Sequence, residues 1–127
     1  MKKNTHRHED YLKLIHRLSK EKPVHGVDLS RALGVSKPTV SVFLKEMTDA
    51  GYITVEKHHV ICLTAKGLDI AEATQDRHET LCSLLESLGV PDTIAAADAC
   101  AIEHDLSPQS YEALKRLLQE HSGVFEE

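Results

Sequence analysis

The sequence predicts a mainly α-helical chain that contains one small β-hairpin. Most apolar residues recur at intervals of three and four, which is the spacing of one helix face. Only residues 52–63 change to a β-branched pattern, and glycine or proline residues divide the rest into segments of helix length. The hydrophobic fraction of 41% allows a packed core, and no apolar run approaches the ~20 residues that cross a bilayer.

Three helices are expected before the hairpin. The first covers residues 9–20, and its apolar stripe consists of Tyr11, Leu14, Ile15 and Leu18. A short helix follows over residues 27–33, with Gly34 at the position after it, where a positive φ is needed. Ser36 is the expected N-cap of the third helix, which ends before Gly51.

Residues 52–63 contain two β-branched runs, YITVE and VICLT, with a short polar stretch between them, and we expect a hairpin there. Three more helices should follow. The first is capped by Thr64 and reaches about Leu88, the second is rich in alanine and covers residues 92–104, and the last begins at Ser107.

Charge is distributed unevenly along the chain. Residues 1–66 hold 12 Lys and Arg against 7 Asp and Glu, whereas residues 67–127 hold 3 against 13. A basic half can face phosphate groups and an acidic half can face cations, so we expect two domains with these bounds. Three widely spaced cysteines, and a charged N-terminus with no apolar stretch after it, predict a cytoplasmic protein.

Three helices followed by a hairpin is the element order of a winged helix-turn-helix domain, in which the third helix enters the major groove of DNA. The outward face of that helix and the hairpin tip carry hydroxyl and ammonium groups that suit phosphates and base edges. The candidate DNA-binding residues are Ser36, Lys37, Thr39, Ser41, Lys45 and Lys57. A module of this kind can instead contact protein, and a charged hairpin tip is often simply solvated.

The second half contains a possible metal site. Cys100, Glu103 and His104 are spaced to lie on one helix face, and thiolate, carboxylate and imidazole are all ligands for late first-row divalent metals. Asp10 and His78 are isolated polar residues that could complete such a site. Without further support, this pattern equally describes a polar helix face with a buried cysteine.

The order of these pieces resembles the DtxR/MntR family of metal-dependent transcriptional repressors. The resemblance runs from EDYLKLIHRL through LGVSKPTVSVFLKEM, GYITVEK and LTAKGLDIA to DRHETL and CAIEHDLS. It implies a winged helix domain followed by an all-helical metal-binding and dimerisation domain, of the type without an SH3-like domain. The metal ligands that it implies are Asp10, His78, Cys100, Glu103 and His104.

The chain departs from both branches of this family. Lys13 stands where the manganese branch has Glu, and Cys100 is typical of the iron branch. Cys82 and Ala96 replace the Glu and His of the iron branch's ancillary site, which puts that site in doubt. Because manganese prefers hard ligands, the sulfur of Cys100 favours iron(II), with manganese or zinc as alternatives.

The function that these expectations describe is a metal-dependent regulator, and most simply a repressor of metal homeostasis genes. Its partners would be a palindromic DNA operator and a second copy of the chain, with no membrane involved. The expected dimer contact is an apolar seam of Leu81, Leu84, Leu85 and Leu88, together with the helix of Tyr111, although each of these residues could equally belong to the core of a single chain. The alternatives are a winged-helix regulator that answers to an organic ligand or to thiol oxidation and, less favoured because no catalytic scaffold is evident, an enzyme.

Overall fold

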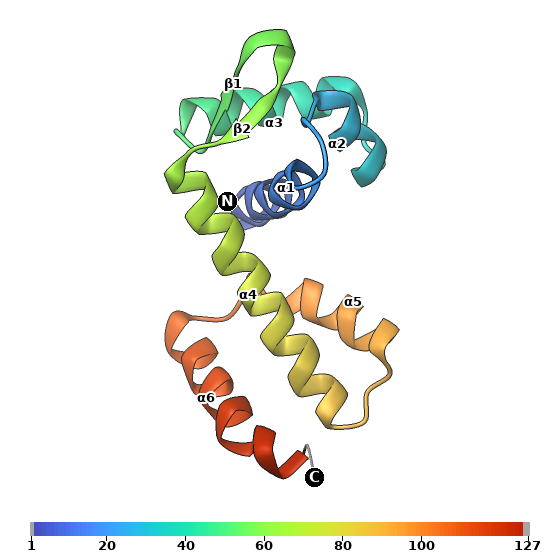
Figure 1. Ribbon diagram of the computed structural model, residues 1–127, viewed down its shortest axis with the longest axis vertical. Coiled ribbons are helices and arrows are strands. Elements are labelled where there is room, and N and C mark those ends of the chain that lie inside the picture. The colour runs from blue at the N-terminus through green and yellow to red at the C-terminus, as the bar shows by residue number, and fades with distance from the viewer. Residues whose placement is uncertain (1, 126–127) are drawn as a thin grey trace. The chain divides into compact units, whose positions relative to one another are not determined.

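The computed structural model consists mainly of helices, with one two-stranded sheet among the described residues (Figure 1). It describes the backbone of residues 2–125 and the side chains of residues 7–120. The elements run in the order α1 (Lys2–Ser19), α2 (Gly26–Leu33), α3 (Lys37–Asp49), β1 (Ile53–Val55), β2 (Ile61–Leu63), α4 (Ala65–Ser87), α5 (Asp92–Ile102) and α6 (Pro108–Phe125). The expected fold class is confirmed. No described helix is both long enough and apolar enough to span a membrane.

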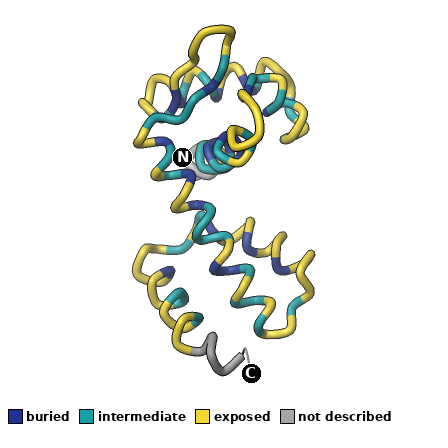
Figure 2. The backbone as a smooth tube through the Cα atoms, viewed as in Figure 1, coloured by how far each residue is buried: buried dark blue, intermediate teal, exposed yellow. Residues whose placement is uncertain are grey.

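The chain forms two compact units, Met1–Ala73 and Thr74–Glu127, and each is described by itself. In the first unit, α1, α2 and α3 precede the hairpin, which is the order of a winged helix-turn-helix domain. Figure 2 shows the buried positions of this unit along α1, α3 and the hairpin. The largest side chains that are fully buried there are Leu12, Ile15, Leu29, Met47, Ile53, Val24 and Val40. Complete burial of one such side chain contributes about 1.5–3 kcal/mol.

The ends of α2 and α3 follow the local signals in the sequence. Gly34 has φ 67°, in the left-handed region, and closes α2. The hydroxyl of Ser36 accepts a hydrogen bond from the backbone N–H of Thr39 at 3.3 Å, which caps α3. By contrast, α1 begins at Lys2 and not at residue 9. Its apolar stripe marks only the buried part of the helix, and the charged residues before it do not interrupt the helix.

The hairpin is short and its tip is turned tightly. Ile53 pairs with Leu63 and Val55 pairs with Ile61, in antiparallel register. The tip, Lys57–His59, is a tight turn in which His58 and His59 have φ values of 61° and 62°, in the left-handed region. The predicted hairpin is therefore confirmed, and its polar residues lie at the exposed end.

The LTAKG segment ties the hairpin to the start of α4. The Thr64 hydroxyl donates to the carbonyl of Gly51 at 2.7 Å and accepts from the backbone N–H of Gly67 at 3.1 Å. A Cβ atom on Gly67 would lie 2.0 Å from the carbonyl oxygen of Tyr52. Only glycine fits at this position without a movement of the backbone, and Thr64 caps α4 as expected.

The second unit, formed by the later part of α4 with α5 and α6, has few buried apolar side chains. They are Leu81, Ala95, Ala99 and Tyr111. A polar cluster adds to this small core: the Tyr111 hydroxyl donates to Asp76, and the Lys115 Nζ lies 3.1 Å from the same carboxylate. The hydrogen bond from Tyr111, and then the ammonium of Lys115, hold the pKa of Asp76 below its ordinary value.

Candidate metal centre and DNA-binding surface

Glu103 lies between two imidazole rings in the second unit. Its carboxylate oxygens are 2.9 Å from Nδ1 of His78 and 3.4 Å from Nε2 of His104. The side chain of Glu103 is fully buried and that of His104 is 5% exposed. A buried carboxylate is costly unless cationic or hydrogen-bonding groups surround it, so the two imidazoles offset part of the cost of burying Glu103.

Arg77 holds the chain that carries this carboxylate. Its Nη1 donates to the carbonyls of Leu106 at 2.7 Å and Glu103 at 3.3 Å. Its guanidinium lies 5.0 Å from the centre of the Tyr111 ring. The last carbonyls of a helix have no partner within the helix, and Arg77 supplies one where α5 ends. In the RHE segment, Arg77 thus holds the end of α5, and the next residue, His78, faces Glu103.

The end of α5 corrects the spacing argument. That argument placed Cys100, Glu103 and His104 on one face of a helix reaching residue 104, but α5 ends at Ile102. Glu103 is its C-terminal cap, and His104 lies in the turn that follows. The side chains of Glu103 and His104 still converge, because the turn brings the His104 ring to the Glu103 carboxylate.

Four of the five predicted metal ligands come together in the second unit. Cys100 is exposed on α5, and its Sγ and a carboxylate oxygen of Glu103 lie within 4.8 Å of one another. His78 and His104 flank the same carboxylate. The fifth residue, Asp10, is half-buried on α1 of the first unit, and its role stays a prediction.

The donor atoms of the second unit fit a divalent metal. Two atoms that each bind one ion at about 2.1 Å lie roughly 3.0–3.4 Å apart when they subtend 90–110° at the ion. The distance from Glu103 to the His104 nitrogen, 3.4 Å, lies at the upper end of this range, and that to the His78 nitrogen, 2.9 Å, lies just below it. One carboxylate, two imidazoles and a thiol are also the ligand types that bind first-row divalent metals.

Sequence reasoning missed one neighbour of this site. The Sγ of Cys82 lies 3.5 Å from Nε2 of His78, on the ring nitrogen that does not face Glu103. The two residues are four apart on α4, so their contact follows from helical spacing. From the sequence, Cys82 was noted only because it replaces the Glu of the iron branch's ancillary site.

The predicted DNA-binding residues are nearly all exposed. Exposed side chains are Ser36, Lys37, Ser41 and Lys45 on or beside α3, and Lys57 at the hairpin tip. Thr39 is half-buried, and its hydroxyl lies 2.8 Å from that of Ser36. Two of the six candidates are therefore engaged in capping α3, and the three lysines are the groups most open to a phosphate backbone.

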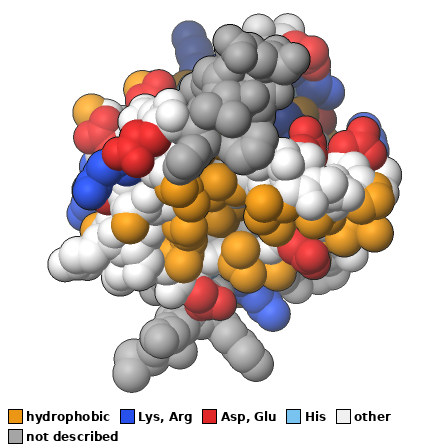
Figure 3. Space-filling model, turned by 90° about the horizontal axis from the view of Figure 1, so that it is seen from below, with side chains coloured by type: hydrophobic (Ala, Val, Ile, Leu, Met, Phe, Trp, Pro, Cys, Tyr) orange, Lys and Arg blue, Asp and Glu red, His pale blue; other side chains and the backbone are white. Residues whose placement is uncertain are grey.

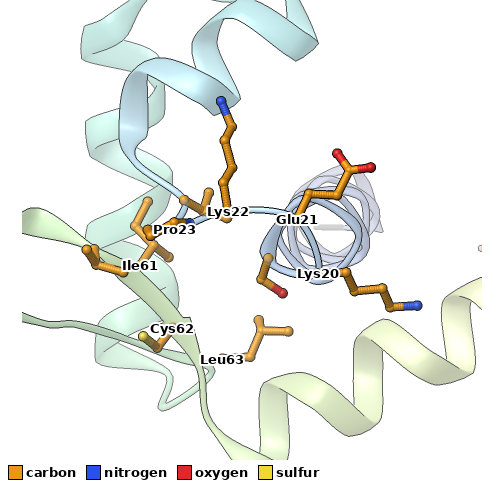
Figure 4. A pocket seen from close by; sticks show the side chains of 10 residues that line it. Lys20, Glu21, Lys22, Pro23, Ile61, Cys62 and Leu63 are labelled. Carbon is orange, nitrogen blue, oxygen red and sulfur yellow. The ribbon is translucent and has the colours of Figure 1, made fainter.

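The first unit also has an open cavity of about 500 Å³ between residues 19–24 and residues 60–63 (Figure 4). It is the kind of space in which an organic effector would bind. In Figure 4 the charged ends of Lys20, Glu21 and Lys22 point away from the strand residues that form the opposite wall. None of the predicted site residues line this cavity.

Comparison with known families decides the classification. Residues 3–60 match the family described as iron dependent repressor, N-terminal DNA binding domain, and residues 64–122 match its metal binding and dimerisation domain. The chain belongs to the DtxR/MntR family of metal-dependent transcriptional repressors. The resemblance in the sequence is thereby confirmed, and so is the order of a winged helix domain and a helical domain.

Individual relatives agree with this classification. The transcriptional regulator MntR of Escherichia coli O157:H7 is 35% identical over 125 residues, which is 95% of this chain and 81% of that protein. An HTH-type transcriptional regulator of Methanocaldococcus jannaschii is 33% identical over 114 residues, covering 87% of this chain and 91% of its own length. These relatives are regulators and not enzymes.

Solved structures give the same fold. A manganese-dependent transcriptional repressor in complex with manganese superposes with a TM-score of 0.80 at 26% identity, over 88% of this chain. The manganese regulator SloR gives a TM-score of 0.78, also at 26% identity and over 88% of this chain. The chain spans about half the length of these two solved chains, 52% and 53% respectively.

Proposed function

We propose that this protein binds operator DNA in the cytoplasm when a divalent metal occupies a site formed by Asp10, His78, Cys100, Glu103 and His104, and that it thereby represses metal homeostasis genes. The observation that supports this most strongly is the buried Glu103 carboxylate between two imidazoles. A cation there would offset the cost of burying that carboxylate.

The metal that we propose is manganese. The sequence favoured iron(II) because of the sulfur of Cys100, but no comparison supports iron specifically beyond the description of the family. The solved relatives described above are named for manganese. In this chain the remaining proposed ligands are carboxylates and imidazoles, which manganese accepts.

The proposed control follows from the origin of the ligands. Asp10 belongs to the first unit and the other four residues belong to the second, so one ion bound by all five would link the DNA-binding unit to the dimerisation unit. In a dimer, this link would favour one spacing of the two α3 helices, which must match half-sites about 34 Å apart. The metal acts by stabilising one conformation of an existing equilibrium.

The proposed dimer contact differs from the seam expected from the sequence. Leu81 and Tyr111 are 3% and 8% exposed, so both are occupied within the unit. Large apolar side chains that remain exposed in this unit are Leu88, Ile94, Ile102 and Leu117. Figure 3 shows hydrophobic side chains gathered over a broad area of one face. Such a surface is expected to meet a second copy.

The test uses DNA selected from a random double-stranded pool by the protein in the presence of manganese(II). Gel shifts with that DNA are then repeated in chelator and after anaerobic addition of manganese(II), iron(II) or zinc(II). We expect binding only with metal, and the tightest binding with manganese at equal free ion. Equal affinity in chelator and in every metal would overturn the proposed function.

A further inference from the structure

The imidazole of His78 is held on both of its nitrogens. Nδ1 lies 2.9 Å from a carboxylate oxygen of Glu103, and Nε2 lies 3.5 Å from the Sγ of Cys82. We propose that Cys82 is a positioning residue that presents Nδ1 of His78 to the metal by accepting a hydrogen bond from Nε2–H when the metal is bound. This inference rests on the proposed function.

Without metal, the hydrogen bonds of His78 fix which ring nitrogen carries the hydrogen. A carboxylate oxygen can only accept a hydrogen bond, so Nδ1 carries the hydrogen that Glu103 receives. In the neutral ring Nε2 then has a lone pair, and the thiol of Cys82 donates its S–H to that lone pair. The same sulfur lies 3.9 Å from the carbonyl of Ala95 on α5, so the single thiol hydrogen can be donated either to Nε2 of His78 or to this carbonyl.

Ligation at Nδ1 requires the other tautomer. The proton on Nδ1 is released to water and a proton from water is taken up on Nε2, so the ring stays neutral and Cys82 stays a thiol. Nε2–H must now donate, and the same sulfur can accept because a thiol is both a weak donor and a weak acceptor. Ligating histidines usually donate their second N–H to a fixed partner, and loss of that partner weakens metal binding 10–100-fold.

A thiol suits position 82 better than a group that can only donate or only accept a hydrogen bond. A carboxylate at position 82 could only accept a hydrogen bond from Nε2–H. It would therefore favour the tautomer that ligates through Nδ1 even without metal. An alanine would leave Nε2 without a partner in either state. Cys82 therefore has a hydrogen bond to Nε2 in both tautomers, but only in the ligating one can it accept from Nε2–H and donate to the carbonyl of Ala95 at the same time, so it favours metal binding.

The experiment compares the native chain with Cys82→Ala, Cys82→Ser and the matched control Cys62→Ser, which alters a half-buried cysteine on β2 in the first unit. Metal affinity is measured by competition with a chelating dye. We expect a loss of about tenfold in Cys82→Ala, recovery to within about threefold in Cys82→Ser because a hydroxyl also donates and accepts, and no change in Cys62→Ser.

Imidazole ¹⁵N spectra of His78 supply a readout that a merely structural role would leave unchanged. The native protein should show the Nδ1–H form without metal and a zinc-bound Nδ1 with Nε2–H after loading. Cobalt(II) should give a sulfur charge-transfer band that persists in Cys82→Ser and disappears in Cys100→Ser. A band lost in Cys82→Ser would make Cys82 a ligand, and a zinc-bound Nε2 would reverse the proposed geometry; either result overturns the inference.

The proposed function and this inference fail in different ways. If the native protein binds no divalent metal, the proposed function fails and the inference falls with it. If the native protein binds metal and Cys82→Ala binds it equally well with the same ring tautomers, only the inference fails.

Discussion

The two units of this protein are stabilised in different ways. The first has a continuous apolar core to which α1, α2, α3 and both strands contribute. Among its described side chains, the second buries only four that are apolar, two of them alanines, and also buries Thr74, Thr80 and Glu103. Its exposed apolar surface and buried carboxylate are the features that a second copy and a metal would cover. We therefore expect the first unit to be stable by itself and the second to gain stability from a metal and from a second copy.

This difference has a functional consequence. A DNA-reading surface must keep α3 at a fixed angle, and a dense core provides that rigidity. A sensor must respond to a ligand that contributes only a few kcal/mol, so it needs a unit of modest intrinsic stability. The predictions below test this contrast, beginning with the largest expected effect on the free energy of unfolding.

The largest effect should come from the core of the first unit. Leu12 is fully buried, and Leu12→Ala should lower the free energy of unfolding of the metal-free protein by about 2–5 kcal/mol, through lost burial and a residual cavity. Val42 is 56% exposed on α3, so Val42→Ala serves as the control and should change it by less than about 0.5 kcal/mol. Urea denaturation followed by circular dichroism measures both. Equal effects would contradict the assigned core.

Gly67 gives the next largest effect. Gly67→Ala places a methyl group against the backbone carbonyl of Tyr52 and should cost about 1–3 kcal/mol, because one of the two segments must move. Gly26→Ala is the matched control, since its Cβ would make only ordinary contacts at 3.7 Å or more. The same denaturation experiment distinguishes them. A Gly67→Ala protein as stable as Gly26→Ala would show that the LTAKG segment can relax.

The sequence predicted local structure well where the signal is local. Ser36 and Gly34 bound their helices through groups within three residues of each end. It failed where the cause is tertiary. The end of α5 at Ile102 follows contacts from Arg77 on another helix, and the burial of Glu103 follows the packing of three segments. Neither can be read from helical periodicity.

The candidate site shows the same division. The residue types and spacing of Cys100, Glu103 and His104 predicted metal chemistry, and the convergence of imidazoles on Glu103 fits that chemistry. The contact between Cys82 and His78 was accessible from their spacing of four, but its meaning depends on which ring nitrogen faces Glu103. That orientation is a property of the folded unit alone.

The polar cluster of the second unit should make its stability depend on pH. The folded-state pKa of Asp76 lies below the ordinary 3.8, chiefly because Tyr111 donates to it, so its stabilising contribution is present above pH 3.8 and is lost as the pH falls through the lowered value. Tyr111→Phe should remove part of this acid dependence and cost about 1 kcal/mol at neutral pH.

The stability that this cluster contributes should also fall at high pH, because Tyr111 then loses its proton. Burial and then the hydrogen bond to Asp76 raise the pKa of Tyr111 above 10.0, and this contribution is lost as the pH rises through the raised value. Denaturation at a series of pH values should therefore show losses at both extremes in the native chain and smaller losses in Tyr111→Phe. Tyr52→Phe, in the first unit, is the control, and identical pH profiles for all three proteins would contradict the assignment.

The smallest effect on stability, and the sharpest test of whether the first unit takes part in metal sensing, concerns Lys13. It is half-buried on α1, three residues after Asp10, so the two lie on one face of that helix. An ammonium group cannot ligate a metal while it is protonated. At an effective dielectric constant of about 20, its charge raises the energy of a nearby dication by several kcal/mol. We therefore expect the native chain to hold one tightly bound metal per subunit.

Lys13→Glu would replace that charge with a carboxylate able to bridge two ions beside Asp10. Its stability without metal should change by less than about 0.5 kcal/mol, while the number of tightly bound metals should rise from one to as many as two per subunit. Equilibrium dialysis with metal analysis measures this number. Lys13→Gln removes the charge without adding a carboxylate, and it should still bind one metal per subunit. This control shows whether a second metal needs the new carboxylate or only the loss of the positive charge. Two tight equivalents in the native chain that both depend on Asp10 would show that Lys13 does not exclude a second ion. If Lys13→Glu still binds only one metal per subunit, then α1 offers no site for a second ion.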